Sequence, residues 1–293
     1  MYNDLFSIGP ITIHGYGLMI GIGILCAYLL SEHLAKKKGL KDDEIFNILI
    51  VVLLFGWASS KLLYFFTIRK EILQDPSLLW KNLGNGWVVY GGIIGGVLSA
   101  VVYLKIKKLP VFRYVELCMP SVALAQGLGR MGCFLAGCCY GVETDLPIGI
   151  TFSHSDFAPN NVSLMPTQLM SSGYDLLLFL ILLILVQKNA RRGMVLGTYT
   201  LVYSIGRFFI EFYRGDLARG TIGSLSTSQF ISIFTILAGA LILILGSLGK
   251  LGGTEAAEES VSHTDRTGAT ENTVVTEDTE ATDNTDDTKD TGS

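Results

Sequence analysis

The segment IFNILIVVLLFGWASSKLLYFF, residues 45–66, decides the fold class of this protein. Its only charged residue is Lys61, and the rest is dominated by Ile, Leu, Val and Phe. A helix of about 20 such residues is long enough to cross the ~30 Å hydrocarbon core of a bilayer. We therefore interpret this segment as a transmembrane helix.

Six further apolar runs occupy other parts of the chain. They cover about residues 15–31, 88–104, 114–131, 168–186, 194–212 and 226–248. The first run follows Met-Tyr-Asn-Asp, which has no Lys or Arg, and this argues against a cleaved signal peptide. The sequence therefore predicts an all-α integral membrane protein, a helical bundle of seven spans.

The basic residues predict how this bundle is oriented. Lys and Arg gather after the first, third and fifth spans, within residues 36–41, 105–113 and 188–192. Residues 131–165, after the fourth span, contain neither. Because cytoplasmic loops carry the excess of Lys and Arg, we expect the N-terminus outside and the C-terminus in the cytoplasm. The predicted location is the bacterial cell (inner) membrane, as a multi-pass protein.

Composition divides the chain into two parts. Charged residues make up 16% of the sequence, against roughly a quarter in soluble domains. Residues 254–293 hold 12 acidic and two basic residues, a net charge of −10, with a Thr at every third position from Thr264 to Thr291. Such a segment lacks the apolar residues that offset the entropy of ordering. We expect a transmembrane domain over residues 1–250 and a disordered, acidic cytoplasmic tail over 251–293, whose binding of a cationic partner is the less favoured alternative.

Several polar side chains fall inside the predicted spans. An ionisable residue there costs at least ~2.5–3.5 kcal/mol on the insertion scale, so it indicates function by default. The predicted topology places the following residues, from five spans, in the outer half of the membrane: His14, Tyr16, Lys61, Tyr90, Arg130, Arg207 and Glu211, with Arg214 just beyond.

The sixth span carries the densest group. Tyr203, Arg207, Glu211 and Arg214 fall within an arc of about 80° on a helix, and Arg207 and Glu211 are four residues apart, so they can pair. One interpretation is a structural ion pair. The other is an anion pocket for a phospholipid phosphate, since Arg is permanently charged and binds two phosphate oxygens at once.

Five cysteines allow several interpretations. Cys26 and Cys118 lie in spans and are typical small core residues. Cys133, Cys138 and Cys139 cluster just after the fourth span. Three interpretations of them are open: free thiols packed in the loop, a disulfide pair, and a metal or redox site. The spacing C-x4-C-C matches no zinc pattern well. The sequence therefore predicts no metal and no cofactor.

Six motifs together resemble one family. They are HGYGLM (14–19), VYGGIIGG (89–96), GRMGCFLAGCCYG (129–141), MPTQL (165–169), YSIGRFFIEFYR (203–214) and SLSTSQ (224–229). In this order they are similar to the prolipoprotein diacylglyceryl transferases, over about residues 5–248. The resemblance implies a transferase of lipoprotein biosynthesis. Such an enzyme moves diacylglycerol from phosphatidylglycerol to the lipobox cysteine of a preprolipoprotein and releases glycerol phosphate. It implies these two substrates as partners, and no nucleic acid.

The resemblance also implies site residues. Tyr90, Arg207, Glu211 and Tyr203 would be catalytic, and His14 joins them because it lies at the right depth. Phospholipid would be bound by Arg130, Gly129, Gly132, Gly141, Tyr16, Lys61 and Gln168.

Several positions depart from the family pattern. Cys133 and Ala136 replace two asparagines, Cys138 replaces a glutamate, and Tyr90 and Met165 replace histidines. Alkylation of a thiol requires a base, cations for the leaving phosphate and exclusion of water. The cations are kept and several hydrogen-bonding groups are not. The alternative is therefore a non-catalytic or thiol-based lipid-binding membrane paralogue.

Overall fold

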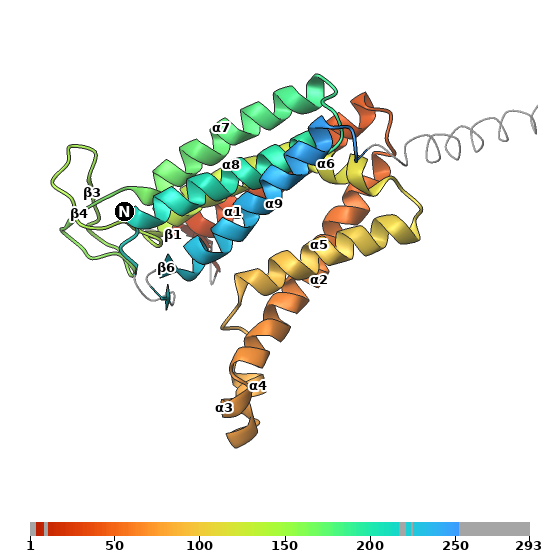
Figure 1. The fold of residues 1–293 in the computed structure, drawn as a ribbon. Helices are drawn as coiled ribbons and strands as arrows, with labels where there is room; N and C mark the ends of the chain where they lie inside the picture. The colour runs from red at the N-terminus through yellow and green to blue at the C-terminus, as the bar shows by residue number, and fades with distance from the viewer. Residues whose placement is uncertain (1–3, 9–10, 217–220, 224, 252–293) are drawn as a thin grey trace, which may run out of the picture. The chain divides into compact units, whose positions relative to one another are not determined.

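The computed structural model describes residues 4–8, 11–216, 221–223 and 225–251. Seven long helices account for most of them (Figure 1). These are α1 (Gly15–Lys37), α2 (Asp43–Thr67), α5 (Val89–Ile106), α6 (Val111–Ala136), α7 (Thr167–Gln187), α8 (Met194–Ile210) and α9 (Thr227–Ser247). Each coincides with one predicted apolar run, including the fifth span. The predicted all-α membrane fold is confirmed at this level.

Five of these helices, α1, α2, α5, α7 and α9, are long and apolar enough to cross a membrane. The chain is therefore a multi-pass membrane protein. The other two helices differ for visible reasons. Helix α6 is less apolar because it carries Arg113, Glu116 and Arg130, and α8 has only 17 residues before η1 (Glu211–Tyr213) continues it as a 3-10 turn.

Short elements that the sequence analysis did not anticipate precede several helices. Three antiparallel hairpins lie before α1, α7 and α9, and two short helices lie between α2 and α5. The hairpins are β1–β2 (Asp4–Ile8, Ile11–His14), β3–β4 (Ile150–Thr151, Ser163–Leu164) and β5–β6 (Thr221–Ile222, Leu225–Ser226); the helices are α3 (Arg69–Gln74) and α4 (Leu78–Lys81). The hairpins lie at the end of the bundle where α1 begins, and α3 and α4 lie at the tip of the α2–α5 pair (Figure 1).

Small residues determine how closely the backbones of paired helices approach. Helices α6, α7, α8 and α9 pack side by side in chain order, α1 packs on α6, and α2 packs on α5 (Figure 1). A Cβ on Gly239 of α9 would lie 2.6 Å from the backbone nitrogen of Leu201, and one on Gly91 of α5 would lie 2.6 Å from the carbonyl of Ser59. Glycine at such contacts lets backbones approach, as is usual between membrane helices.

The best-buried apolar cluster lies near the end of the bundle where α1 finishes. It includes Leu34, Leu104, Tyr114 and Leu182, and the Tyr114 hydroxyl donates to the Lys41 carbonyl at 3.1 Å. Glu116 belongs to the same end, where its carboxylate accepts hydrogen bonds from the backbone nitrogens of Gly193 (2.8 Å) and Leu196 (3.3 Å) at the start of α8. Its role is to cap that helix, since acceptors satisfy the open N–H groups of a first turn.

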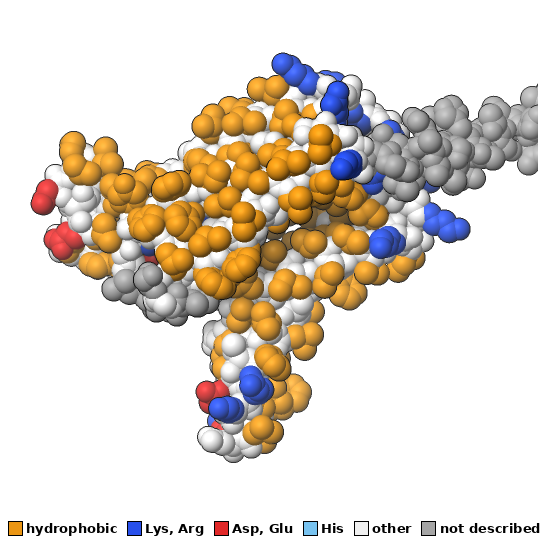
Figure 2. Space-filling model, viewed as in Figure 1, with side chains coloured by type: hydrophobic (Ala, Val, Ile, Leu, Met, Phe, Trp, Pro, Cys, Tyr) orange, Lys and Arg blue, Asp and Glu red, His pale blue; other side chains and the backbone are white. Residues whose placement is uncertain are grey.

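Charge is segregated along the bundle. Figure 2 shows one group of Lys and Arg side chains near the end of the helices where α1 and α7 finish and a second group, beside acidic side chains, at the tip formed by α3 and α4. Apolar side chains cover α7, α8 and α9 between the ends. This distribution agrees with the alternation of basic connections in the sequence. Residues 252–293 lie outside the described residues, so the acidic tail stays a prediction.

Candidate functional site

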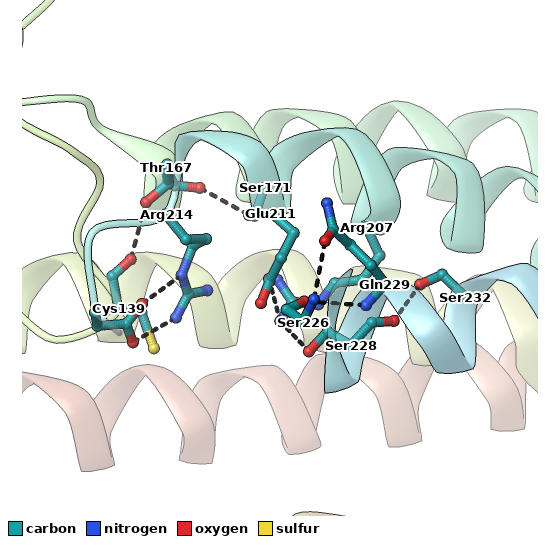
Figure 3. A network of polar contacts seen from close by, with 11 residues as sticks. Cys139, Thr167, Ser171, Arg207, Glu211, Arg214, Ser226, Ser228, Gln229 and Ser232 are labelled. Carbon is teal, nitrogen blue, oxygen red and sulfur yellow. Dashed lines mark hydrogen bonds and ion pairs between the residues drawn. The ribbon is translucent and has the colours of Figure 1, made fainter. Parts of the chain in front are cut away.

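The candidate site is built where α6 and α8 end and α7 and α9 begin (Figure 3). Helix α9 starts with a capping box: the Ser226 hydroxyl accepts from the Gln229 backbone nitrogen, and the Gln229 side chain accepts from the Ser226 nitrogen, both at 3.1 Å. This reciprocal pair fixes the first turn of α9. It thereby holds Ser228 against the last turn of α8.

Arg207 is the centre of this network. Its Nη2 forms an ion pair with the Glu211 Oε2 at 2.8 Å and donates to the Ser228 hydroxyl at 2.9 Å. The carboxylate oxygen meets the guanidinium off the hydrogen-bond axis, so this contact is an ion pair rather than a directed hydrogen bond. The Nη1 of Arg207 is buried and has no hydrogen-bond partner among the described residues. The predicted i,i+4 pair is therefore formed, and the Nη1 of Arg207 can still donate hydrogen bonds to a ligand.

Arg214 has a different partner. Its Nε and Nη2 donate to the two carboxylate oxygens of Asp216 at 2.8 and 2.7 Å, which is the bidentate geometry. Burial disfavours the charge of Arg214, but the hydrogen bonds with Asp216 more than offset this and raise the pKa of the guanidinium above its usual range. Arg214 is thus a fixed, neutralised cation.

Arg130, in the last two turns of α6, completes the cationic group. It lies within electrostatic reach of Tyr203, Cys133, Cys139 and Arg214, and Arg207 lies within reach of Arg130 and Arg214. No hydrogen bond or ion pair joins the Arg130 guanidinium to another described residue. Three guanidinium groups from separate segments therefore gather at one end of the bundle. We call Arg130, Arg207 and Arg214 the arginine cluster.

Buried carboxylates limit the excess positive charge. Glu211 and Asp216 contact the arginine cluster directly, and Asp175 of α7 is 4% exposed and within electrostatic reach of Arg130 and Arg207. Three arginines facing three carboxylates form a nearly balanced group when no ligand is bound. The donors of Arg130 and the Nη1 of Arg207 are those that remain for an anion.

The loop after α6 is fastened to the start of α7. The Thr167 hydroxyl donates to the Cys139 carbonyl and the Gln168 side-chain amide donates to the Cys138 carbonyl, both at 2.9 Å. Gln168 is 1% exposed, and its Oε1 has no partner in the described structure. Gln168, assigned to phospholipid binding on resemblance, is thus seen to orient the loop.

The signature glycines have separate structural roles. A Cβ on Gly132 would lie 3.2 Å from the Tyr16 carbonyl, so this glycine permits α1 to cross α6 closely. Gly141 pairs its backbone nitrogen with the Met165 carbonyl at 3.0 Å, and a Cβ there would lie 2.8 Å from the Tyr213 carbonyl. A Cβ on Gly129 would meet no atom within 4 Å. Gly132 and Gly141 therefore act on the backbone that carries the site.

A cavity of about 290 Å³ opens beside the loop that follows α6. Its lining includes His14, Tyr16 and Cys138. The His14 Nδ1 lies 2.6 Å from the Asp4 carboxylate, which orients the imidazole. Tyr16 is 42% exposed and lies within electrostatic reach of Cys138 and Arg130. The structure thus brings His14 and Tyr16 to one cavity with Cys138, and it places Tyr16 within electrostatic reach of Arg130.

The cysteine loop has an unusual backbone. Gly137 ends α6 with φ +75° and Cys139 has φ +63°, so two of three consecutive residues have a left-handed backbone. The Sγ atoms of Cys133, Cys138 and Cys139 all lie within 4.8 Å of one another, and no disulfide joins the described cysteines. Hydrogen bonding with the Cys133 thiol, contact with Cys139 and burial raise the pKa of the Cys138 thiol. A disulfide pair, one of the three interpretations, is not formed in this structure.

Lys61 and Tyr90 are not part of the arginine cluster. The Lys61 Nζ donates to the carbonyls of Asn82, Asn85 (2.6 Å) and Gly86 (3.1 Å) and lies 4.4 Å from the centre of the Trp87 ring. These carbonyls occupy all three of its N–H donors. Tyr90 begins α5 and is 40% exposed, and among the described residues no hydrogen bond or ring contact joins it to the cluster. The expectation that Lys61 contacts phosphate is therefore not supported by its geometry.

Comparison with known proteins places the chain in a family. A family profile described as prolipoprotein diacylglyceryl transferase matches residues 3–245. A phosphatidylglycerol–prolipoprotein diacylglyceryl transferase of Clostridium tetani is 50% identical over 235 residues, 80% of this chain and 94% of the relative. The chain belongs to the prolipoprotein diacylglyceryl transferase family.

Two other members of the family are also similar to the chain. A relative named phosphatidylglycerol–prolipoprotein diacylglyceryl transferase 2, from Clostridium perfringens, is 47% identical over 81% of this chain and 93% of its own length. One from Clostridioides difficile is 32% identical over 80% and 91%. The chain therefore covers nearly the full length of these family members, and residues after about 245 lie beyond the match.

Within this family fold, three site residues were missed by sequence reasoning. Asp216 holds Arg214 from two residues further along the chain, and Ser228 holds Arg207 through a contact between α8 and α9. Asp175 could have been found, because it is an ionisable residue inside an apolar run, which is the criterion that identified Arg130. Tyr203, which was predicted, stacks on Tyr199 with ring centres 5.7 Å apart.

Proposed function

We propose that this chain transfers the diacylglyceryl group of phosphatidylglycerol to the cysteine thiol of a preprolipoprotein. The observation that carries the proposal is the arginine cluster at one end of an apolar helix bundle. Clustered guanidinium groups bind phosphate strongly, because their fixed donors match phosphate oxygens in pairs. The full-length similarity to relatives that bear this enzyme's name supports the same substrates.

In the proposed mechanism the cluster grips the phosphate that leaves. The substrate thiolate attacks the glycerol carbon bonded to the phosphate oxygen, the carbon–oxygen bond breaks, and glycerol phosphate departs with the bonding electrons. Arg207, through Nη1, and Arg130 stabilise the charge that develops on this phosphate. Glu211 and Ser228 orient Arg207, and Asp216 orients Arg214.

A proton acceptor for the thiol must lie close to this site. His14 and Cys138 line the same cavity, and the imidazole of His14 is held by Asp4. Tyr90, which stands at the family's histidine position, begins a helix packed on α2 and is not joined to the cluster in the described residues. We therefore assign the acceptor role to His14 rather than to Tyr90.

The proposed topology has seven spans. Helix α6 packs on α7 and helix α8 packs on α9. Together α8 and η1 have 20 residues, about 30 Å of helix, which is long enough to cross the membrane. With the basic connections inside, the N-terminus and the arginine cluster face the outside of the inner membrane. Phosphatidylglycerol would then reach the cluster from the outer leaflet.

The test is transfer by the purified protein. Wild-type chain, Arg207→Ala and Arg191→Ala are incubated with phosphatidylglycerol vesicles and a lipobox peptide, and the lipidated peptide is measured by mass spectrometry. Removal of a charge-stabilising group lowers kcat by about 10²–10³, so Arg207→Ala is expected to fall by that factor. Arg191, which donates to the Ser247 carbonyl at the other end of the bundle, is the control. Full activity in Arg207→Ala would remove the clamp from the mechanism.

A thiol-based membrane paralogue is the second candidate, because three cysteines converge beside the cavity. Complementation of a bacterial strain that lacks the transferase separates the two. The transferase proposal expects complementation by the wild-type chain and not by Arg207→Ala. Correct membrane insertion without complementation would favour the paralogue.

A further inference from the structure

The three clustered cysteines have no role in the mechanism above, and their geometry is that of a ligand set. Cys133 lies in the last turn of α6, and the left-handed Gly137 and Cys139 turn the chain so that Cys138 and Cys139 face it. The Sγ atoms of all three lie within 4.8 Å of one another. In a tetrahedral thiolate site, Zn–S bonds of about 2.3 Å place neighbouring sulfurs about 3.8 Å apart. A small inward movement of the thiols reaches this spacing.

The backbone that carries the thiols is held before any ligand binds. The Cys138 nitrogen donates to the Cys133 carbonyl at 3.1 Å, and the carbonyls of Cys138 and Cys139 accept from Gln168 and Thr167. Two of these anchors come from the first turn of α7, 28–30 residues further along the chain. Such supporting hydrogen bonds orient metal ligands and are a usual part of a metal site.

The charges around the thiols favour an anionic metal complex. Three thiolates and one Zn²⁺ carry a net charge of −1. Arg130 lies within electrostatic reach of Cys133 and Cys139, and Arg214 lies within reach of Cys139. Soft sulfur ligands select Zn²⁺ or Cu⁺ over the hard cations Mg²⁺ and Ca²⁺. A zinc complex here would be stabilised by the same arginines that bind phosphate.

A three-cysteine zinc site leaves one position open. In the described part of the chain, no fourth His, Cys, Asp or Glu completes the group. Structural zinc sites have four protein ligands, whereas catalytic ones have three and keep the fourth position for water or substrate. Cys138 lines the cavity of about 290 Å³, so the open position is reachable from outside the loop.

We propose that Cys133, Cys138 and Cys139 bind one Zn²⁺, and that its fourth position takes the cysteine thiol of the lipoprotein substrate. This assignment rests on the proposed function. A thiol that coordinates Zn²⁺ is deprotonated, and the thiolate is the form that reacts as a nucleophile. The site therefore activates the substrate thiol in addition to the proton acceptor, His14.

The step balances without any redox partner. The thiol binds Zn²⁺ and gives its proton to the His14 imidazole on the same cavity, from which it passes to solvent. The bound thiolate forms a bond to the glycerol carbon, and the carbon–oxygen bond to phosphate breaks. Glycerol phosphate leaves with that electron pair on the arginine cluster. The product thioether carries no charge, binds Zn²⁺ weakly and dissociates.

Metal binding is tested first, by a readout that does not depend on activity. The full chain is purified in detergent, its zinc is measured by mass spectrometry, and the zinc is exchanged for Co²⁺. We expect one metal per chain, with the thiolate-to-cobalt charge-transfer band and the intense visible bands of tetrahedral cobalt. Cys133→Ser, Cys138→Ser and Cys139→Ser are each expected to lose the band, while Cys26→Ser keeps it. A wild-type chain without these bands and without zinc would overturn the proposal whatever the variants do.

Substrate coordination is tested on the cobalt form. A lipobox peptide should shift the visible bands, and the same peptide with Ser in place of its Cys should not. An unchanged spectrum with the Cys peptide would refute the substrate role. Chelation should abolish transfer, and Zn²⁺ should restore it. Full transfer after chelation, or in a triple-serine chain, would also refute that role. A spectral response without transfer would leave the zinc site standing and refute the proposed function instead.

Discussion

At the scale of single residues, the arginines of the cluster are not equivalent. Arg214 is matched by the two oxygens of Asp216, whereas Arg207 shares one nitrogen between Glu211 and Ser228 and keeps Nη1 unpaired. A buried donor without a partner is costly, by about 1–3 kcal/mol. Such a cost is offset when an anion binds. Arg207 is therefore the residue at which ligand binding and stability are most directly linked.

Asp216→Asn tests the fixed role of Arg214. Removing one partner of a buried ion pair costs on the order of 3 kcal/mol, because the other charge stays buried. The Tm of the purified protein, followed by intrinsic fluorescence, should fall by several degrees. Lys81→Ala is the matched control: its pair with Asp75 is exposed, and exposed pairs contribute about 0–1 kcal/mol. Equal Tm values for the two variants would show that Arg214 does not need Asp216.

Lys61 shows that the depth of a residue in a predicted span does not by itself identify a phosphate ligand. Its position near the end of a span predicted a phosphate ligand, but the carbonyls of residues 82–86 lie closer and use all its donors. Lys61→Met should therefore lower the Tm. It should leave the KM for phosphatidylglycerol within about twofold of wild type, because a change at a residue that shares no partner with the arginine cluster has little effect on binding there. Transfer rates over a range of lipid concentration give this KM. A large rise in KM at unchanged Tm would return Lys61 to the phosphate site.

At the scale of elements, the long helices were predictable and the junctions were not. The run beginning at Met194 was placed to the residue, and that beginning at Gln168 within one residue, because apolar length is a local property. The fastening of Cys138 to Gln168 depends on residues 30 positions apart. The hairpins pair neighbouring segments, but the strands of two of them have only two residues each, too few to show an alternating pattern. The pairing of Arg207 with Glu211 was predictable from i,i+4 spacing, whereas that of Arg207 with Ser228 was not.

Gly141→Ala tests the junction of three segments. The added methyl group would overlap the backbone of Met165 and lie 2.8 Å from the Tyr213 carbonyl. Overpacking of this kind costs about 1–3 kcal/mol, and here it would also separate the loop after α6 from the end of α8. We expect a lower Tm together with lost transfer. Gly173→Ala, where a Cβ meets nothing within 4 Å, is the control for Tm. Unchanged Tm and activity in Gly141→Ala would contradict the tight junction.

At the scale of the whole molecule, the site and the basic connections lie at opposite ends of the helices. Thr167 begins α7 beside Cys139, and Lys188 follows the end of the same helix, 21 residues on. That length spans about 31 Å of helix, which matches the hydrocarbon thickness. In the proposed topology, one side of the membrane holds the lipid-phosphate chemistry and the other holds the charges that fix orientation.

This separation predicts which introduced thiols face the outside. Asp145→Cys, in the loop after α6, should react with a membrane-impermeant maleimide in cells whose inner membrane is intact and whose outer membrane, if present, has been removed. Lys188→Cys should react only after the inner membrane is permeabilised, because the positive-inside rule puts its loop in the cytoplasm. The wild-type chain is labelled in parallel, so that the native cysteines are subtracted. Labelling of both positions in intact cells would place the two ends of α7 on one side, and the arginine cluster could then not draw its phospholipid from the leaflet opposite the basic loops.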